Sequence, residues 1–271
     1  LKMKNTEKSR KKSVSSLLLC LTGLILIGIA LALLIPNLLD YKKSNDTYEN
    51  LQEAYVTEDS KTEDAIEEES SEEAEQISEE WKNVTIDFDS LEKQNADIIG
   101  WIRFDNMEQL SYPILYSGDD STYLRTDIYG NSTIAGCIFM EGLNNPDFQD
   151  CHTILYGHNM KNLSMFGSLK KYKTENFYED NQYFTIYTRE GAYRYQIFSY
   201  RDVPEDDSVY AVGFAPDDTF QDFINVMKRK SYYDTGVTVT KDDHVMTLST
   251  CSSTGKRFVV HAVRVDEYYI Q

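Results

Sequence analysis

From residue 81 onward, the chain is a series of short apolar runs separated by turn-forming residues. The runs are rich in Val, Ile, Thr, Tyr and Phe, and they are bounded by Gly, Asn, Asp or Pro, which is typical of strands. The predicted strands are 100–104, 112–116, 136–140, 153–157, 183–188, 192–203, 245–250 and 258–265. Many short strands of mostly antiparallel type indicate a mainly β fold, either a barrel or a sandwich.

Three segments follow the 3.6-residue period of a helix instead. The pattern predicts a helix over 89–99, a short one around 166–172 and a longer one over 220–230, with Asp217 or Asp218 placed to cap the start of the last. Its apolar residues stand at i, i+3, i+4 and i+7, namely Phe220, Phe223, Ile224 and Met227. We expect this stripe to pack into the core and not to line a ligand site.

The N-terminal part of the chain has a different pattern. Residues 17–39 form a run of 23 residues without a charge, which at about 1.5 Å per residue is long enough to cross roughly 30 Å of hydrocarbon. Residues 1–16 hold six Lys/Arg and one acid, Glu7, and such a basic flank stays in the cytoplasm. A cleaved signal would have an apolar core of about 7–15 residues and a small-residue cleavage site. We therefore expect an uncleaved transmembrane anchor at 17–39.

An acidic segment separates this anchor from the β-rich region. Residues 44–80 hold 15 Asp/Glu and a single Lys, so they bury too little apolar surface to offset chain entropy. We expect 40–80 to be a solvated stalk, disordered or partly helical, that contributes no core and whose removal leaves an active domain. The predicted organisation ends with one globular domain at 81–271. The formal charge of −18 argues against a nucleic-acid partner.

Four cysteines stand outside any metal-ligand spacing: Cys20, Cys137, Cys151 and Cys251. Cys20 lies inside the anchor, whereas Cys137 and Cys151 either pair in an oxidising exterior or stay buried thiols. Cys251 is then left over, and a single thiol on an exported protein calls for an explanation. The acidic residues cluster in the stalk, so we expect neither a metal ion nor a cofactor.

The surroundings of Cys251 offer one explanation. A thiol nucleophile needs an adjacent base or cation, and acyl transfer needs donors for the developing oxyanion. Cys251 ends a strand, and five turn-forming residues separate it from Arg257, so a hairpin would make the two neighbours at one end of the sheet. His158 ends another predicted strand. On residue types alone, a buried Cys, a surface His and a solvated Arg are the more ordinary interpretations.

Three further histidines compete with His158. His261 lies on the same strand face as Arg257 but deeper along the strand, and we expect it to be packed. His152 and His244 stand in loop or acidic contexts, and we expect both at the surface.

Several motifs surround Cys251 and His158 in a fixed order. Residues 247–251 read TLSTC and are followed by RFVVHA at 257–262, and these two motifs resemble the signature of sortases. Residues 156–160 (YGHNM) are similar to the histidine segment of class B sortases. Further segments that fit the family are 95–102, 112–114, 123–124, 136–139 and 164–166. The resemblance runs from about 91 to 265 with the motifs in the expected order, so it is specific.

The resemblance implies a closed β-barrel of about eight strands with peripheral helices, including an N-terminal helix and a long helix before the cysteine strand. It implies a cysteine transpeptidase that cleaves the C-terminal sorting signal of secreted proteins through a thioacyl enzyme. Cys251 would be the nucleophile and His158 the general acid and base. Arg257 would hold the substrate carbonyl and stabilise the oxyanion.

The resemblance also assigns a peptide groove to Leu124, Tyr156 and Ser249. Two features depart from the family pattern. The loop between Cys251 and Arg257 is shorter than in many class B members, and Asp120 stands where an Asn is expected.

The implied acceptor is an amine of peptidoglycan or of its precursor, and hydrolysis is the side reaction. The implied location is a single-pass membrane protein of a Gram-positive envelope, held by 17–39, with a cytoplasmic N-terminus and an extracellular catalytic domain. Pilin polymerisation, which uses a Lys acceptor, is an alternative. A non-catalytic wall-binding module is another. A papain-like peptidase is disfavoured, because its Cys precedes its His and Arg257 would have no role.

Overall fold

A computed structural model describes residues 2–58, 79–251 and 255–270, and for residues 2–20 and 251 it describes the backbone alone. The chain divides into two compact units, Leu1–Lys43 and Ser44–Gln271. Helix α1 (Lys2–Tyr55) runs through the first unit and ends in the second.

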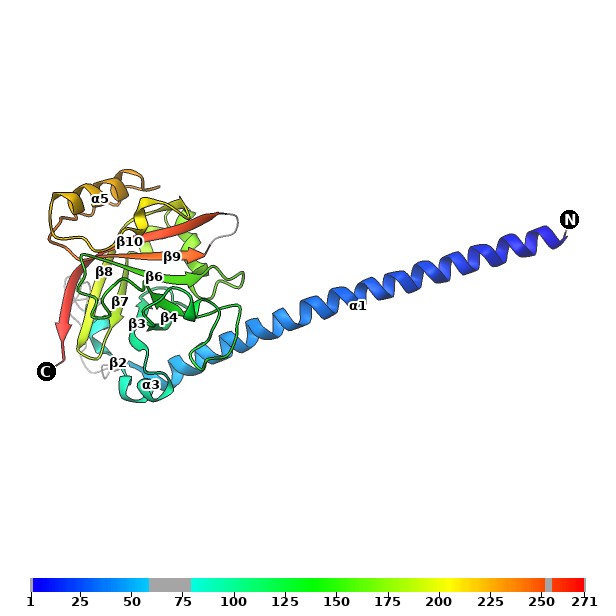
Figure 1. The fold of residues 1–271 in the computed structure, drawn as a ribbon, viewed down its shortest axis with the longest axis horizontal. Helices are drawn as coiled ribbons and strands as arrows, with labels where there is room; N and C mark the ends of the chain where they lie inside the picture. Colours follow the sequence, from blue (N-terminus) through cyan, green and yellow to red (C-terminus); the bar gives the residue numbers. More distant parts are fainter. Residues whose placement is uncertain (1, 59–78, 252–254, 271) are drawn as a thin grey trace, which may run out of the picture. The chain divides into compact units, whose positions relative to one another are not determined.

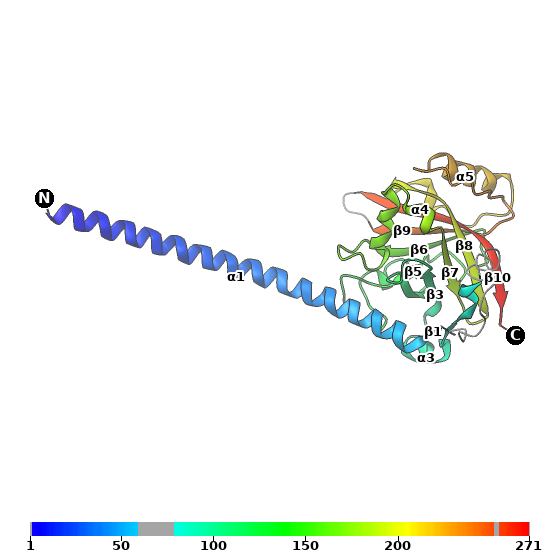
Figure 2. The ribbon, with the colours of Figure 1, turned by 180° about the vertical axis from the view of Figure 1, so that it is seen from behind.

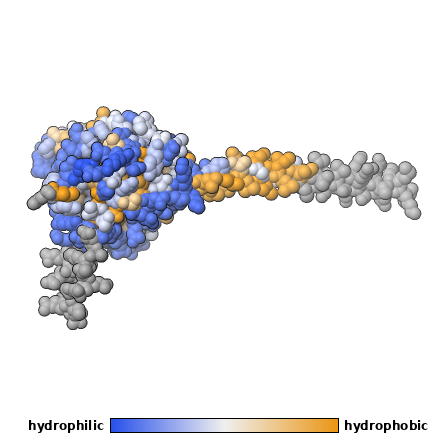
Figure 3. Space-filling model, turned by 90° about the horizontal axis from the view of Figure 1, so that it is seen from below, coloured by the Kyte–Doolittle hydropathy of each residue, from blue (hydrophilic) through white to orange (hydrophobic). Residues whose placement is uncertain are grey.

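The described side chains of the first unit belong to an apolar stretch of α1. One helix among the described residues, Leu21–Tyr55, is long and apolar enough to cross a membrane, with a mean hydropathy of 2.3 in its most apolar window. Its large apolar side chains are exposed, from Leu21 to Leu39. Figure 3 shows this stretch coloured almost throughout as hydrophobic. By length and composition, α1 is therefore a candidate membrane span.

The second unit is built around a closed barrel of eight strands (Figure 1). Its strands are β3 (Ile98–Phe104), β4 (Ser111–Leu115), β5 (Ile138–Met140), β6 (His152–His158), β7 (Tyr183–Tyr187), β8 (Gly191–Pro204), β9 (Val245–Cys251) and β10 (Lys256–Tyr269). Their order around the barrel is β10-β8-β7-β3-β4-β5-β6-β9. The pairs β4–β5 and β6–β9 are parallel and the other pairs are antiparallel. All the predicted strands are confirmed.

Short helices surround the barrel (Figure 2). They are α3 (Phe88–Gln94), α4 (Phe177–Asp180), α5 (Asp218–Arg229) and the 3₁₀ turns η1 (Glu80–Asn83), η2 (Thr122–Leu124), η3 (Phe166–Lys173) and η4 (Ser208–Tyr210). The helix predicted over 89–99 is too long. It ends at Gln94, and Ile98 already pairs with Leu115 of β4.

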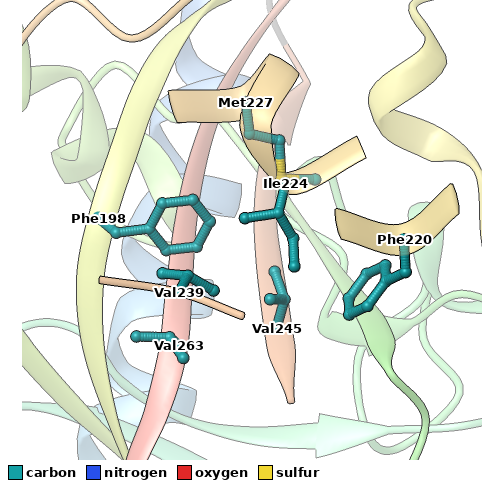
Figure 4. Close-up of a cluster of buried hydrophobic side chains, with 7 residues drawn as sticks. All are labelled: Phe198, Phe220, Ile224, Met227, Val239, Val245 and Val263. Carbon is teal, nitrogen blue, oxygen red and sulfur yellow. The ribbon is translucent and has the colours of Figure 1, made fainter. Parts of the chain in front are cut away.

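Helix α5 covers one side of the barrel with the predicted apolar stripe. Asp217 caps it by accepting hydrogen bonds from the backbone N–H groups of Thr219 and Phe220. Figure 4 shows three side chains of the helix against side chains of β8, β9 and β10. The members of this cluster are Phe198, Phe220, Ile224, Met227, Val239, Val245 and Val263. The stripe is core packing, as predicted, and it anchors the connection between β8 and β9.

The end of α1 also belongs to the folded unit. Tyr48 and Leu51 are 6% and 2% exposed, and β1 (Val56–Glu58) pairs with β2 (Val84–Ile86) in a small sheet. The statement that the acidic segment contributes no core is therefore wrong for its first part. Sparse apolar residues at 48 and 51 lie on one face of the helix, and the average acidity of the segment conceals them. Residues 59–78 lie outside the described part of the chain.

Candidate active site

Three strand ends meet at one edge of the barrel. Strand β6 ends at His158, β9 ends at Cys251, and β10 begins beside Arg257. In the strand register, the Cα of Cys251 pairs with that of His158 on one side and with that of Arg257 on the other. The predicted antiparallel pairing of the two strands is therefore present, and the backbone of Cys251 lies between the two other site residues.

A glycine lets β6 reach this position. A Cβ on Gly157 would lie 2.5 Å from Cδ1 of Ile138 and 2.7 Å from Cδ2 of Phe166. Any larger residue would push the end of β6 away from β5 and η3. The close approach holds the following residue, His158, next to the end of β9.

The imidazole of His158 is half-buried and oriented by the backbone. Its Nε2 lies 2.7 Å from the carbonyl oxygen of Leu124. Because a carbonyl only accepts hydrogen bonds, we assign the proton of the neutral ring to Nε2, which leaves Nδ1 free of a proton. Burial lowers the pKa of His158, and the positive charges of Arg125 and Arg257 lower it further, while the Leu124 carbonyl opposes them.

Arg257 and its neighbour Lys256 have different environments. Alternation along β10 directs them to opposite faces of the sheet. The side chain of Arg257 is 27% exposed, and its Nη1 lies 2.9 Å from Oε1 of Glu205, at the end of β8. Lys256 is exposed. Glu205 was not anticipated, because an acid in the run 205–207 carries no sequence signal.

The predicted groove residues lie around the same edge. Tyr156 and Ser249 are paired in the register of β6 and β9, and Leu124 ends η2 beside His158. Ser249 Oγ and the Tyr210 hydroxyl are 3.0 Å apart, and the rings of Tyr156 and Tyr210 stack with centroids 6.3 Å apart. Tyr210 was missed because its place depends on the path of the long β8–β9 connection, which has no local pattern.

An acidic pair lies next to Tyr156. The Tyr156 hydroxyl donates to Oε2 of Glu141 at 2.6 Å, and Oδ1 of Asp120 accepts from the backbone N–H of Gly142 at 2.8 Å. Burial raises the pKa of Glu141, and the negative charge of Asp120 raises it further. The unexpected Asp120 therefore stands beside a second carboxyl at the groove.

The two other described cysteines are unsuited to nucleophilic attack. Cys137 and Cys151 are free thiols, so the open question of a disulfide is answered by two unpaired side chains. Burial raises the pKa of Cys137 to about 12 and also raises that of Cys151. Neither is a thiolate at neutral pH.

The prediction for His152 is wrong. Its side chain is fully buried, with Nδ1 at 2.7 Å from the Ala211 carbonyl and Nε2 at 2.7 Å from Thr247 Oγ1. The β8–β9 connection covers the start of β6, which the sequence pattern does not reveal. His261 is packed, as predicted, and its Nδ1 lies 2.8 Å from Thr247 Oγ1. His244 is half-buried, and its Nδ1 lies 3.0 Å from the Asp150 carbonyl.

The barrel edge brings together the backbone position of a thiol, an imidazole and a guanidinium, which are the groups that acyl transfer to sulfur uses. Among the described side chains, no group of three or more His, Cys, Asp or Glu is arranged to hold a metal ion.

Known proteins share this fold. A sortase domain family model matches residues 103–265. Sortase B of Staphylococcus aureus is 37% identical over 185 residues, which cover 67% of this chain and 75% of that protein. A solved S. aureus sortase B–substrate complex is 31% identical over 86% of this chain and 100% of that chain, with a TM-score of 0.69. A solved sortase B complexed with triglycine is 36% identical over 66% of this chain and 85% of that chain, with a TM-score of 0.63.

The barrel and these matches define a cysteine transpeptidase, and the chain belongs to the sortase family. Within that family it is a class B sortase.

Proposed function

We propose that the chain cleaves the C-terminal sorting signal of secreted proteins through a thioacyl intermediate on Cys251. The acyl group then passes to an amine of peptidoglycan or its precursor. The observation that carries the proposal is the register that sets the Cα of Cys251 between those of His158 and Arg257. The solved relatives with a substrate and with triglycine support a peptide donor and an amine acceptor.

The first half of the reaction is an acyl transfer to sulfur. The neutral imidazole of His158 accepts the thiol proton through Nδ1, because Nε2–H is held by the Leu124 carbonyl. The Cys251 sulfur attacks the scissile carbonyl, and the imidazolium gives its proton to the leaving amine. In the second half, His158 takes a proton from the incoming amine, which attacks the thioester, and the imidazolium returns that proton to the departing sulfur of Cys251.

Arg257 stabilises the oxyanion of both tetrahedral intermediates. Its planar guanidinium presents several donors, so it can keep one contact to Glu205 while another N–H group turns to the substrate oxygen. The partial exposure of the Glu205 pair makes this rearrangement easy, because such surface pairs are worth about 0–1 kcal/mol.

Leu124, Tyr156 and Ser249 contact the sorting-signal peptide, and Tyr210 forms part of the same wall. The stacking of Tyr210 on Tyr156 and its contact with Ser249 support that extension of the groove.

The apolar run 17–39 holds the protein in the cell membrane with the basic tail inside and the catalytic unit outside. The length, hydropathy and exposure of this part of α1 support that location. Pilin polymerisation remains the alternative use of the same chemistry, since it differs only in the acceptor amine.

The test is turnover of a sorting-signal peptide by the full chain with and without triglycine. We expect an amine-dependent product, slow hydrolysis without the amine, and no loss when a chelator is added. His158→Ala should lower kcat by about 10²–10⁴-fold. Hydrolysis alone would indicate a peptidase, and no turnover of any donor would favour a wall-binding module.

A further inference from the structure

The end of α1 is fastened to the loop that carries the orienting carbonyl of His158. Ser44 Oγ lies 2.9 Å from Thr133 Oγ1, and the Tyr48 hydroxyl donates to the Gly136 carbonyl at 2.7 Å. The same hydroxyl lies 3.4 Å from Sγ of Cys137. The side chains of Ser44 and Tyr48 are buried, so water does not substitute for these contacts.

The loop transmits this attachment over a short distance. The backbone N–H of Cys137 donates to the Tyr123 carbonyl at 3.0 Å, and its thiol donates to the Thr126 carbonyl at 3.1 Å. Gly136 has a φ of +58°, and a Cβ there would lie only 2.6 Å from the carbonyl oxygens of Tyr123 and Leu124. The backbone held by Tyr48 is therefore packed directly against the Leu124 carbonyl.

That carbonyl is the partner of His158 Nε2 at 2.7 Å. A continuous set of contacts thus runs from Tyr48 through Gly136 and Leu124 to the imidazole. The direction of a carbonyl determines where a ring N–H points, and the ring tautomer follows from the same bond. Tyr48 therefore reaches the imidazole through backbone contacts of this loop.

We propose that Tyr48 is a positioning residue for His158, which makes the end of the N-terminal helix part of the catalytic apparatus. The proposal rests on the function of His158 put forward above. Tyr48 acts through the 123–137 loop by keeping the Leu124 carbonyl aimed at Nε2. Nδ1 therefore stays free of a proton and available to accept one.

A Tyr48 contact that only stabilised the fold would give a different result. Its loss would lower the stability of the fold but leave the tautomer and pKa of His158 unchanged. Tyr178 supplies the matched comparison. It is 6% exposed, like Tyr48, and its hydroxyl also donates to a backbone carbonyl, that of Ile197 at 2.9 Å.

The experiment compares Tyr48→Phe with Tyr178→Phe in the full chain in detergent micelles. Tyr48→Phe keeps the ring and its edge contact with Tyr112 but removes the donor. We expect kcat to fall about 5–20-fold with KM within about twofold, since losing an orienting contact costs part of the roughly 10²–10⁴-fold that acid–base catalysis contributes. In ¹⁵N-histidine spectra, the Nε2–H tautomer of His158 should become mixed. Its pKa should fall, because the Leu124 bond that raises it is weakened.

Tyr178→Phe should leave kcat, tautomer and pKa at the wild-type values. Ser44→Ala removes the second contact of the helix. It should change kcat and the tautomer and pKa of His158 in the same direction as Tyr48→Phe, but by less. Unchanged His158 spectra and kcat in Tyr48→Phe would overturn the proposal, as would equal losses in Tyr178→Phe. His158→Ala, assayed in parallel, separates a failure of the role assigned to His158 from a failure of the role assigned to Tyr48. If it keeps full activity, the role of His158 is wrong, and if it is inactive, failure of Tyr48→Phe concerns Tyr48 alone.

Discussion

At the scale of single residues, two adjacent cations begin β10, and only one of them faces the proposed site. The Cα of Arg257 pairs with that of Cys251, and the charge of Arg257 lowers the pKa of His158. Lys256 is exposed and points to the other face of the sheet. The two side chains are therefore a matched pair for testing which cation stabilises the oxyanion.

We predict that Arg257→Ala lowers kcat/KM about 10²–10³-fold, the usual cost of losing an oxyanion donor. Arg257→Lys should lose much of the activity too, because an ammonium group lacks the planar fork of donors. Lys256→Ala should stay within about threefold of the wild type, since it lies on the opposite face. Measuring the three variants on one peptide checks this. A crippled Lys256→Ala beside an active Arg257→Ala would refute the assignment.

The site residues differ in how well they can be predicted from the sequence. Cys251, His158 and Arg257 each stand where a clear strand meets turn formers, so their meeting could be predicted from strand ends and family motifs. Tyr210 and Glu205 reach the site from the connection between β8 and β9, whose path depends on tertiary packing. No local pattern marks such residues, and they required the structure.

At the scale of elements, the strands were predictable because their apolar runs are short and sharply bounded. The helix predicted over 89–99 is too long, because Ile98 and Ile99 fit the period of a helix as well as that of a strand. Their segment pairs with β4, so it is a strand. The burial of His152 was missed for a related reason. Whether a strand's first residue is exposed depends on what crosses above it, here the segment around Ala211.

A buried polar chain joins three strands to that segment. Thr247 of β9 lies between His152 of β6 and His261 of β10, and His152 donates to the Ala211 carbonyl. Burial lowers the pKa of His152 to about 4 and that of His261 well below its usual value. Both rings are therefore neutral in the folded protein at neutral pH.

We predict that acid destabilises the fold through these two rings. As the pH falls below about 6.5, these histidines bind protons in the unfolded chain. In the folded chain they stay neutral until the pH reaches their lower pKa. Stability is thus complete above about pH 6.5 and is lost as the pH falls toward 4, by about 3 kcal/mol for His152. Urea unfolding between about pH 7.5 and about pH 4.5 measures it.

His152→Gln should show a shallower loss of stability than the wild type over the same pH range. Comparing variants removes the contribution of the many carboxylates, which all of them share. A wild-type unfolding free energy that stays flat from about pH 7 to about pH 5 would contradict the role of the buried histidines.

At the scale of the whole molecule, strand order and barrel closure do not follow from local patterns. The sequence pattern left a barrel and a sandwich both open, and the family resemblance decided between them. The folded unit begins earlier than the charge distribution indicated, at Ser44. Two buried apolar side chains are enough to pack the end of this acidic helix into the folded unit, and an average over the segment hides them.

We therefore predict that removing residues 2–43 leaves a stable catalytic unit, whereas removing 2–80 does not. The longer deletion exposes the surface that Tyr48 and Leu51 cover, and burying two such side chains is worth about 3–6 kcal/mol. Chemical unfolding of the two truncated proteins measures the difference. Equal unfolding free energies would mean that the end of α1 is dispensable, as its composition alone suggested.

The central claim is that the thiol of Cys251 is the acyl carrier of this sortase. The most direct measurement is to trap the full chain with a sorting-signal peptide that carries a thiol-reactive group and to map the adduct by mass spectrometry. We predict one adduct, on Cys251, absent from Cys251→Ala together with all turnover. An adduct on Cys137 or Cys151, or turnover that survives Cys251→Ala, would contradict the account.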